Sequence, residues 1–141
     1  MTLEEKILIV NGKNIIVYAN MLIEKYINDN GLNHNINQTM FIQKMLLRKL
    51  ILLALTKVLS YSFGIIVLNE DNMYGSQHSR NIGNMLDIYI TETESFIWHI
   101  ARSIRGLDND TQTVYLDLYI HGSNLHIMVS TIESREKYEM S

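Results

Sequence analysis

The chain has 141 residues, of which 47% are hydrophobic and 19% charged, and its formal net charge is −3. This length suits one ordinary domain, so we expect a single domain over residues 1–141 whose charged tail is frayed from about residue 134. The absence of cysteine excludes disulfides and thiolate metal sites and is typical of a reducing compartment, while the acidic balance disfavours general nucleic-acid binding.

Residue usage indicates the kind of genome that encodes the chain. Proline is absent, where average usage of about 5% would give roughly seven, and alanine is rare, whereas isoleucine and asparagine are abundant. Because Pro and Ala have GC-rich codons and Ile and Asn have AT-rich ones, we infer an AT-rich genome, such as that of a phage or another mobile element. Glu4 and Glu5 stand where a secretory signal needs positive charge, so we expect a cytoplasmic protein.

The first thirty residues carry competing signals. Thr2 begins a capping-box pattern that could start a helix, whereas Asn11-Gly12 between two apolar runs is typical of a β-hairpin. From Ile15 the apolar spacing becomes helical and stops at Gly31, a typical residue after the end of a helix. We predict a short strand, a turn at Asn11-Gly12 and a helix over about 14–30.

A second helix is clearer and much more apolar. Asn37 or Thr39 can cap it, and it runs to about Ser60. Its polar stripe is so narrow that we expect a long, very apolar and central helix. Because a chain of this size covers such a helix with difficulty, we predict that helix 40–59 is the interface of a homo-oligomer.

The run Leu50–Leu68 is long enough to suggest a membrane-spanning helix as an alternative. Lys57 lies near its middle, where a lysine costs about 2.5–3.5 kcal/mol on insertion scales. We therefore expect no membrane insertion, but a buried helix, a turn at Gly64 and a strand over 65–68.

The stretch 71–81 is polar and is predicted to be a loop, while two periods compete in the segment that follows it. Ile82, Tyr89 and Ile97 belong to a set with helical spacing. Residues 87–93, in contrast, alternate and are rich in β-branched side chains, as strands are. We predict a strand over 85–91 and a helix over 92–105 that ends before Gly106.

Two alternating runs near the C-terminus predict a β-hairpin. Both apolar sets share one face only if Ile120 lies opposite Leu125, which leaves Gly122-Ser123 as a two-residue loop of type II′. The register then places Tyr119 opposite His126, Asp117 opposite Met128 and Tyr115 opposite Ser130. The fold class that follows is α+β: a small antiparallel sheet, including a C-terminal hairpin 113–121/124–132, packed against two or three helices.

No catalytic motif is present, but three groups of residues are candidates for a site. The hairpin register places Asp117, Tyr119, His121 and His126 on one face, where the two imidazoles could act as an acid–base pair. The alternative is a hairpin face exposed to solvent or covered by a partner. Since no third metal ligand can be identified, we expect no metal and no cofactor.

The other two candidate groups would bind a ligand or a partner. Trp98, Arg102 and Arg105 fall on one helical stripe with Thr91 and Glu94, and such a stripe could hold an anion or a protein. Alternatively, Trp98 covers an edge of the core with Arg102 stacked on its ring. His78 and Arg80 lie in the polar loop beside Tyr74 and Gln77, and His99 is expected at the edge of the core.

Three functions remain open on the sequence alone. The first is a non-enzymatic, homo-oligomeric binding protein, such as a phage- or mobile-element-encoded inhibitor or sequestering factor for a protein or for a small anionic ligand such as a nucleotide. The second is a small enzyme that acts on a nucleotide or phosphodiester through His121 and His126, which requires Arg80, Arg102 or Arg105 to approach these histidines. The third is a structural or assembly component of a virus.

Overall fold

The computed structural model describes residues 5–32, 35–69, 77–107, 110 and 112–131, with the side chains of residues 77–80 excepted. The predicted frayed tail from residue 134 lies outside the described residues. The described elements are β1 (Glu5–Asn11), α1 (Lys13–Asp29), α2 (Ile36–Phe63), β2 (Ile66–Leu68), α3 (Gln77–Arg105), β3 (Thr113–His121) and β4 (Asn124–Thr131). They confirm the predicted α+β class.

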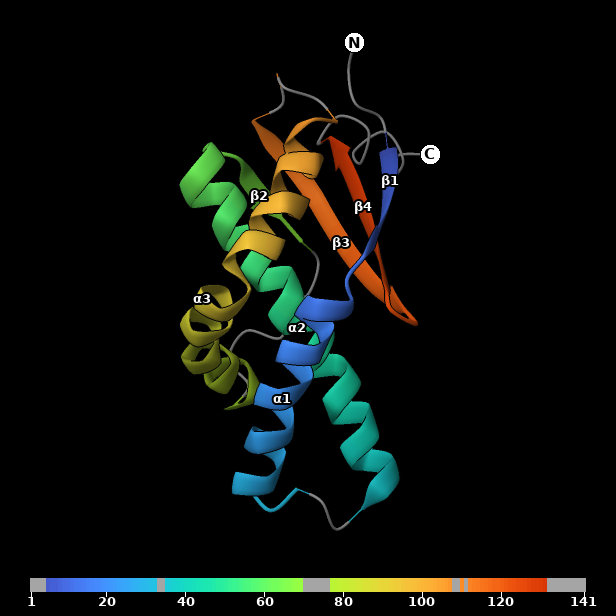
Figure 1. The fold of residues 1–141 in the computed structure, drawn as a ribbon, viewed down its shortest axis with the longest axis vertical. Coiled ribbons are helices and arrows are strands. Elements are labelled where there is room, and N and C mark those ends of the chain that lie inside the picture. Colours follow the sequence, from blue (N-terminus) through green and yellow to red (C-terminus); the bar gives the residue numbers. More distant parts are fainter. Residues whose placement is uncertain (1–4, 33–34, 70–76, 108–109, 111, 132–141) are drawn as a thin grey trace.

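The strands form one four-stranded sheet in the order β1-β4-β3-β2. β4 pairs antiparallel with both β1 and β3, whereas β2 pairs parallel with β3. The sheet is therefore mixed, and the expectation of a purely antiparallel sheet was wrong at β2. In Figure 1 the helices lie on one side of the sheet. α1 and the first half of α2 extend beyond the end of the sheet.

The predicted strand, turn and helix at the N-terminus are confirmed. The N–H of Gly12 donates to the carbonyl of Ser123 at 2.8 Å, which ties the turn to the tip of the β3–β4 hairpin. A Cβ at Gly12 would lie 2.5 Å from Cγ of Leu125, a fully buried side chain. Glycine is therefore required here by the close approach of β4.

The long second helix is also confirmed, and it begins earlier than predicted. Its N-cap is Asn35, whose side chain accepts from the backbone N–H of Gln38 at 3.3 Å. The predicted caps Asn37 and Thr39 lie inside the helix instead. The helix ends at Gly64, which has a φ of 66° as a left-handed cap requires. Over the described residues, no helix is long and apolar enough to span a membrane.

Most of the apolar surface of α2 is covered within this one chain. Its buried residues run from Ile42 to Leu59, between α1, α3 and the sheet. The exposed apolar side chains lie towards its two ends, at Ile36, Met40, Phe41 and Tyr61. Little of helix 40–59 is left for a second copy to cover, and self-association through it stays a prediction.

The strand predicted over 85–91 is wrong, because residues 77–105 are helical. A kink at the non-helical Thr93 divides them into two segments, and the second agrees with the helix predicted over 92–105. The helical period decides the structure: Ile82, Tyr89 and Ile97 are all fully buried on one face. The hydroxyls of Thr91 and Thr93 donate to backbone carbonyls four residues earlier, a contact that bends helices, and Thr93 is where the helix is kinked. The predicted loop 71–81 overlaps the start of this helix, and residues 70–76 lie outside the described part.

The hairpin register is confirmed at every predicted pair. Tyr119 lies opposite His126, Asp117 opposite Met128, and Ile120 opposite Leu125. Gly122 has a φ of 61°, which a glycine at the first position of the turn adopts without strain. The inner face of the hairpin completes the hydrophobic core with Val114, Leu116, Leu118, Leu125, Ile127 and Val129.

Candidate functional site

The sheet face that points away from the helices carries several exposed apolar side chains among polar ones, and we call it the outer face. Side chains alternate along each strand, so this face carries Ile7 and Ile9 of β1, Tyr119 of β3, and Met128 of β4. Ile7 and Ile9 are each 58% exposed, and Ile66 of β2 is 59% exposed. A solvated sheet face is normally polar, so these exposed isoleucines are the unusual feature of the outer face.

The four hairpin candidates lie on this outer face, but only three of them contact one another. The rings of Tyr119 and His126 are stacked with centroids 4.5 Å apart. The ring of His121 meets that of His126 edge-on, with centroids 5.7 Å apart. Tyr119 and His121 are exposed and His126 is half-buried, so the aromatic cluster is open to a partner.

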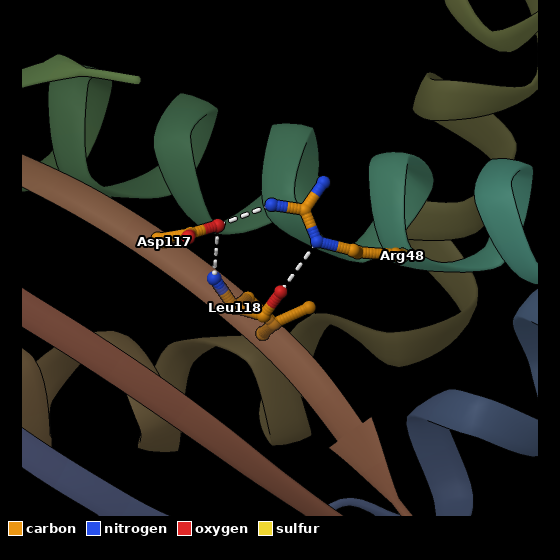
Figure 2. A network of polar contacts seen from close by, with 3 residues as sticks. All are labelled: Arg48, Asp117 and Leu118. Atoms are coloured by element: carbon orange, nitrogen blue, oxygen red, sulfur yellow. Dashed lines mark hydrogen bonds and ion pairs between the residues drawn. The ribbon is translucent and has the colours of Figure 1, made fainter. Parts of the chain in front are cut away.

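Asp117, the fourth candidate, is engaged at the margin of the sheet. Its carboxylate forms an ion pair with Arg48 of α2 and accepts the backbone N–H of Leu118 at 2.8 Å. The Arg48 guanidinium also donates to the carbonyl of Leu118 (Figure 2). This contact satisfies both backbone groups of Leu118, beyond the point where β2 ends.

The Trp98 stripe is assembled against the end of α2. The half-buried ring of Trp98 packs edge-on against Phe63 with centroids 5.3 Å apart. Arg102 lies 6.0 Å from the Trp98 ring centroid, and Arg105 donates to the carbonyl of Phe63 at 3.3 Å. This is the arrangement of the alternative interpretation, in which Trp98 covers an edge of the core.

The remaining candidates are placed as follows. His78 and Arg80 belong to the first turns of α3 rather than to a loop, and their side chains lie outside the described residues, as does Tyr74. His99 is exposed instead of being held at the core edge, and its Nδ1 lies 3.4 Å from a guanidinium nitrogen of Arg102.

His99 also lines a cleft that sequence analysis did not anticipate. The cleft has a volume of about 750 Å³ and lies between the β1–α1 turn and the second half of α3. Its polar lining includes Asn11, Lys13, Ser95 and Ser103, and no carboxylate occurs among the described lining residues. Such a lining can accept a polar or anionic group.

Two contributors to these surfaces were missed in the sequence. The continuous apolar run Ile7–Val10 was a signal, since an edge strand needs apolar side chains on one face only. The role of Arg48 left no local signal, because its partners lie about seventy residues away. Within the described ranges, no three His, Asp or Glu side chains gather closely enough to hold a metal ion.

Fold and surface together define the class: a small α+β protein with a two-layer arrangement and a sheet face that none of the described helices covers. Comparison with protein-family models, curated proteins and solved structures found no match. The function is therefore argued from the residues of this chain.

Proposed function

We propose that this chain is a non-enzymatic binding protein that holds another protein on the outer face of its sheet. The observation that carries the proposal is the exposure of Ile7, Ile9 and Ile66, each more than half exposed on a face that no described helix covers. Exposed apolar side chains gathered on one face mark interaction sites. Ile7 and Ile9 lie together on β1 beside Met128 and His126 of β4, whereas Ile66 lies at the opposite margin of the sheet, on β2. An inhibitor or sequestering factor is the role that suits a small chain with such a surface.

The charges of the outer face favour a protein partner with an apolar surface. Among the described strand residues on this face, the full charges are the carboxylates of Glu5 and Asp117, and Asp117 is paired with Arg48. Nucleic acid requires concentrated cations, and no lysine or arginine occurs among these residues. The exposed Tyr119, stacked on His126, adds the aromatic surface that is enriched at protein interfaces.

The phosphodiesterase alternative receives less support from the geometry. The contacts described for Arg102 and Arg105 are with His99, Trp98 and Phe63, and not with the hairpin. Asp117 is engaged by Arg48 rather than by an imidazole. The pair His121 and His126 therefore has neither an anion-holding group nor an orienting carboxylate among its described contacts.

The test is a pull-down from extracts of the cells in which the chain is naturally produced, with the wild type, Tyr119→Glu and Tyr61→Glu as baits. Both changes place a carboxylate where an exposed tyrosine stood, but Tyr119 is on the outer face and Tyr61 is 82% exposed at the end of α2. We expect the wild type and Tyr61→Glu to retain the same partner, and Tyr119→Glu to lose it at least tenfold, because a buried carboxylate without a partner is costly.

Circular dichroism and thermal unfolding establish that both variants remain folded. If Tyr119→Glu retains the partner as well as Tyr61→Glu does, the outer face is not the binding surface and the proposal fails.

A further inference from the structure

The two margins of the sheet differ in how their backbone groups are satisfied. Beyond β2, the free side of β3 is closed at Leu118 by the Asp117 carboxylate and the Arg48 guanidinium. At the opposite margin β1 pairs with β4 alone among the described strands. The outward backbone groups of a seven-residue edge strand are a template for another strand.

The pairing pattern identifies which groups of β1 point outwards. Leu118 directs its N–H and C=O away from β4, and the direction alternates along an antiparallel strand. The backbone groups of Asp117 and its partner Met128 therefore hydrogen-bond to each other. The backbone groups of Ile127 point towards β1, and those of its partner Leu8 point back towards β4. Ile7 and Ile9, the neighbours of Leu8, consequently direct their N–H and C=O groups outwards.

These outward groups are complementary to a second copy of the same strand. If two β1 strands run antiparallel about a two-fold axis at Leu8, Ile7 of one copy faces Ile9 of the other, and all seven residues overlap. The outward N–H and C=O of each isoleucine then meet their counterparts directly. The outer faces of the two sheets join into one, with four isoleucines side by side at its centre.

The charges of β1 are compatible with this register. Glu5 would face Asn11 of the second copy and Lys6 would face Val10, so no like charges are opposed. A lysine on an edge strand often prevents pairing, but Lys6 is exposed and lies two residues from the axis. Its aliphatic stem can lie along Val10 of the second copy while its ammonium group stays in water.

We propose that two copies of this chain associate through β1, forming a continuous eight-stranded sheet with the two-fold axis at Leu8. The inference goes beyond the proposed function and does not rest on it, because it is argued from the outward backbone groups of β1, although the side chains of Ile7 and Ile9 belong to both surfaces. It also gives the predicted self-association a surface other than helix 40–59.

Cysteine cross-linking tests the interface and its register, since the chain has no cysteine of its own. On the axis, Leu8 faces its own copy in a non-hydrogen-bonded pair, whose Cα atoms are about 4.5 Å apart, close enough for a disulfide. In Leu8→Cys, mild oxidation should yield a covalent dimer of twice 16.4 kDa. The matched control is Lys6→Cys on the same strand. Its Cα would lie about 13 Å from the Cα of residue 6 in the second copy, because four residues of strand separate them, and it should cross-link at least tenfold more slowly.

A second measurement uses the unmodified chain and Ile9→Pro. The N–H of Ile9 points away from β4, so proline there spares the β1–β4 ladder and removes an outward donor from the margin, together with the Ile9 side chain on the outer face. Sedimentation equilibrium should give a dimer for the wild type, with a dissociation constant at least tenfold weaker in Ile9→Pro. Amide exchange at Ile7 and Ile9 should slow as the concentration rises.

Three results would overturn the proposal. They are a wild type that stays monomeric at high micromolar concentration, a dimer that Ile9→Pro leaves intact, and equal cross-linking of Leu8→Cys and Lys6→Cys. Slow amide exchange at Ile7 and Ile9 in a monomer would also overturn the proposal, because the chain would then cover the margin of β1 by itself. Tyr119→Glu lies two strands from β1, so partner loss and dimer loss are scored separately.

Discussion

Tyr89 connects α3 to the start of α1 from inside the core. Its side chain is fully buried, and its hydroxyl donates to the carbonyl of Ile15 at 2.8 Å. Burial raises the pKa of this phenol far above its ordinary value, and the hydrogen bond with Thr93 offsets only part of that effect. The folded state therefore keeps the phenolic proton at pH values where the unfolded chain loses it.

This linkage predicts a loss of stability in alkali. Since the folded-state pKa is raised, the contribution of Tyr89 is fully present below the unfolded value of 10.0 and declines as the pH rises above it. The slope there approaches about 1.4 kcal/mol per pH unit. Urea unfolding at pH 8 and pH 11 measures it, and Tyr89→Phe is the control that should lack this part of the decline. An equal decline in both proteins would contradict the assignment.

Replacement by alanine is expected to change the free energy of unfolding in opposite directions at two glycines in different surroundings. Gly12→Ala should lower the free energy of unfolding by about 1–3 kcal/mol, because the new methyl group collides with Leu125 in a packed core. Gly83→Ala is the matched control in α3, where a Cβ meets nothing within 4 Å, and it should raise that free energy by about 0.5–1 kcal/mol. Urea denaturation measures both, and a destabilising effect of similar size in each would refute this account.

At the scale of elements, Arg48 links α2 to the free side of β3. Arg48→Ala leaves the Leu118 carbonyl without its charged donor and should cost about 1–2 kcal/mol. Lys44→Ala removes a cation from the exposed side of the same helix and should change stability by less than about 0.5 kcal/mol. Thermal and urea unfolding compare the two variants, and equal effects would show that the contact at Leu118 contributes nothing.

Local patterns predicted some elements and misled at others, for physical reasons. The β3–β4 register follows from alternation alone, because a one-residue slip would place Leu116 and Ile127 in water. In α3, alternation over 87–93 suggested a strand, but burial of Ile82, Tyr89 and Ile97 in the core outweighs local β propensity. The helix is kinked at Thr93, close to the boundary that was expected at residues 91–92.

Across the whole molecule, contacts between distant segments are what the sequence could not supply. The outer position of β1 depends on its pairing with β4, more than a hundred residues later, and the parallel β2–β3 pair has no local signature. For the candidate site, the residues on the hairpin face could be predicted because the register of the hairpin could be predicted. The participation of Ile7 and Ile9 was not, because it depends on which strand β1 joins.

The closed side of β3 sets a limit on how this sheet can grow. β2 offers an incoming strand only three residues, and the Leu118 groups beyond it are already bonded to Asp117 and Arg48. Over the described residues, each molecule thus has one sheet margin, that of β1, at which another strand can pair along its full length. The proposed pairing at β1 would occupy that margin, so the two chains would form a closed dimer rather than the repeating unit of a fibre.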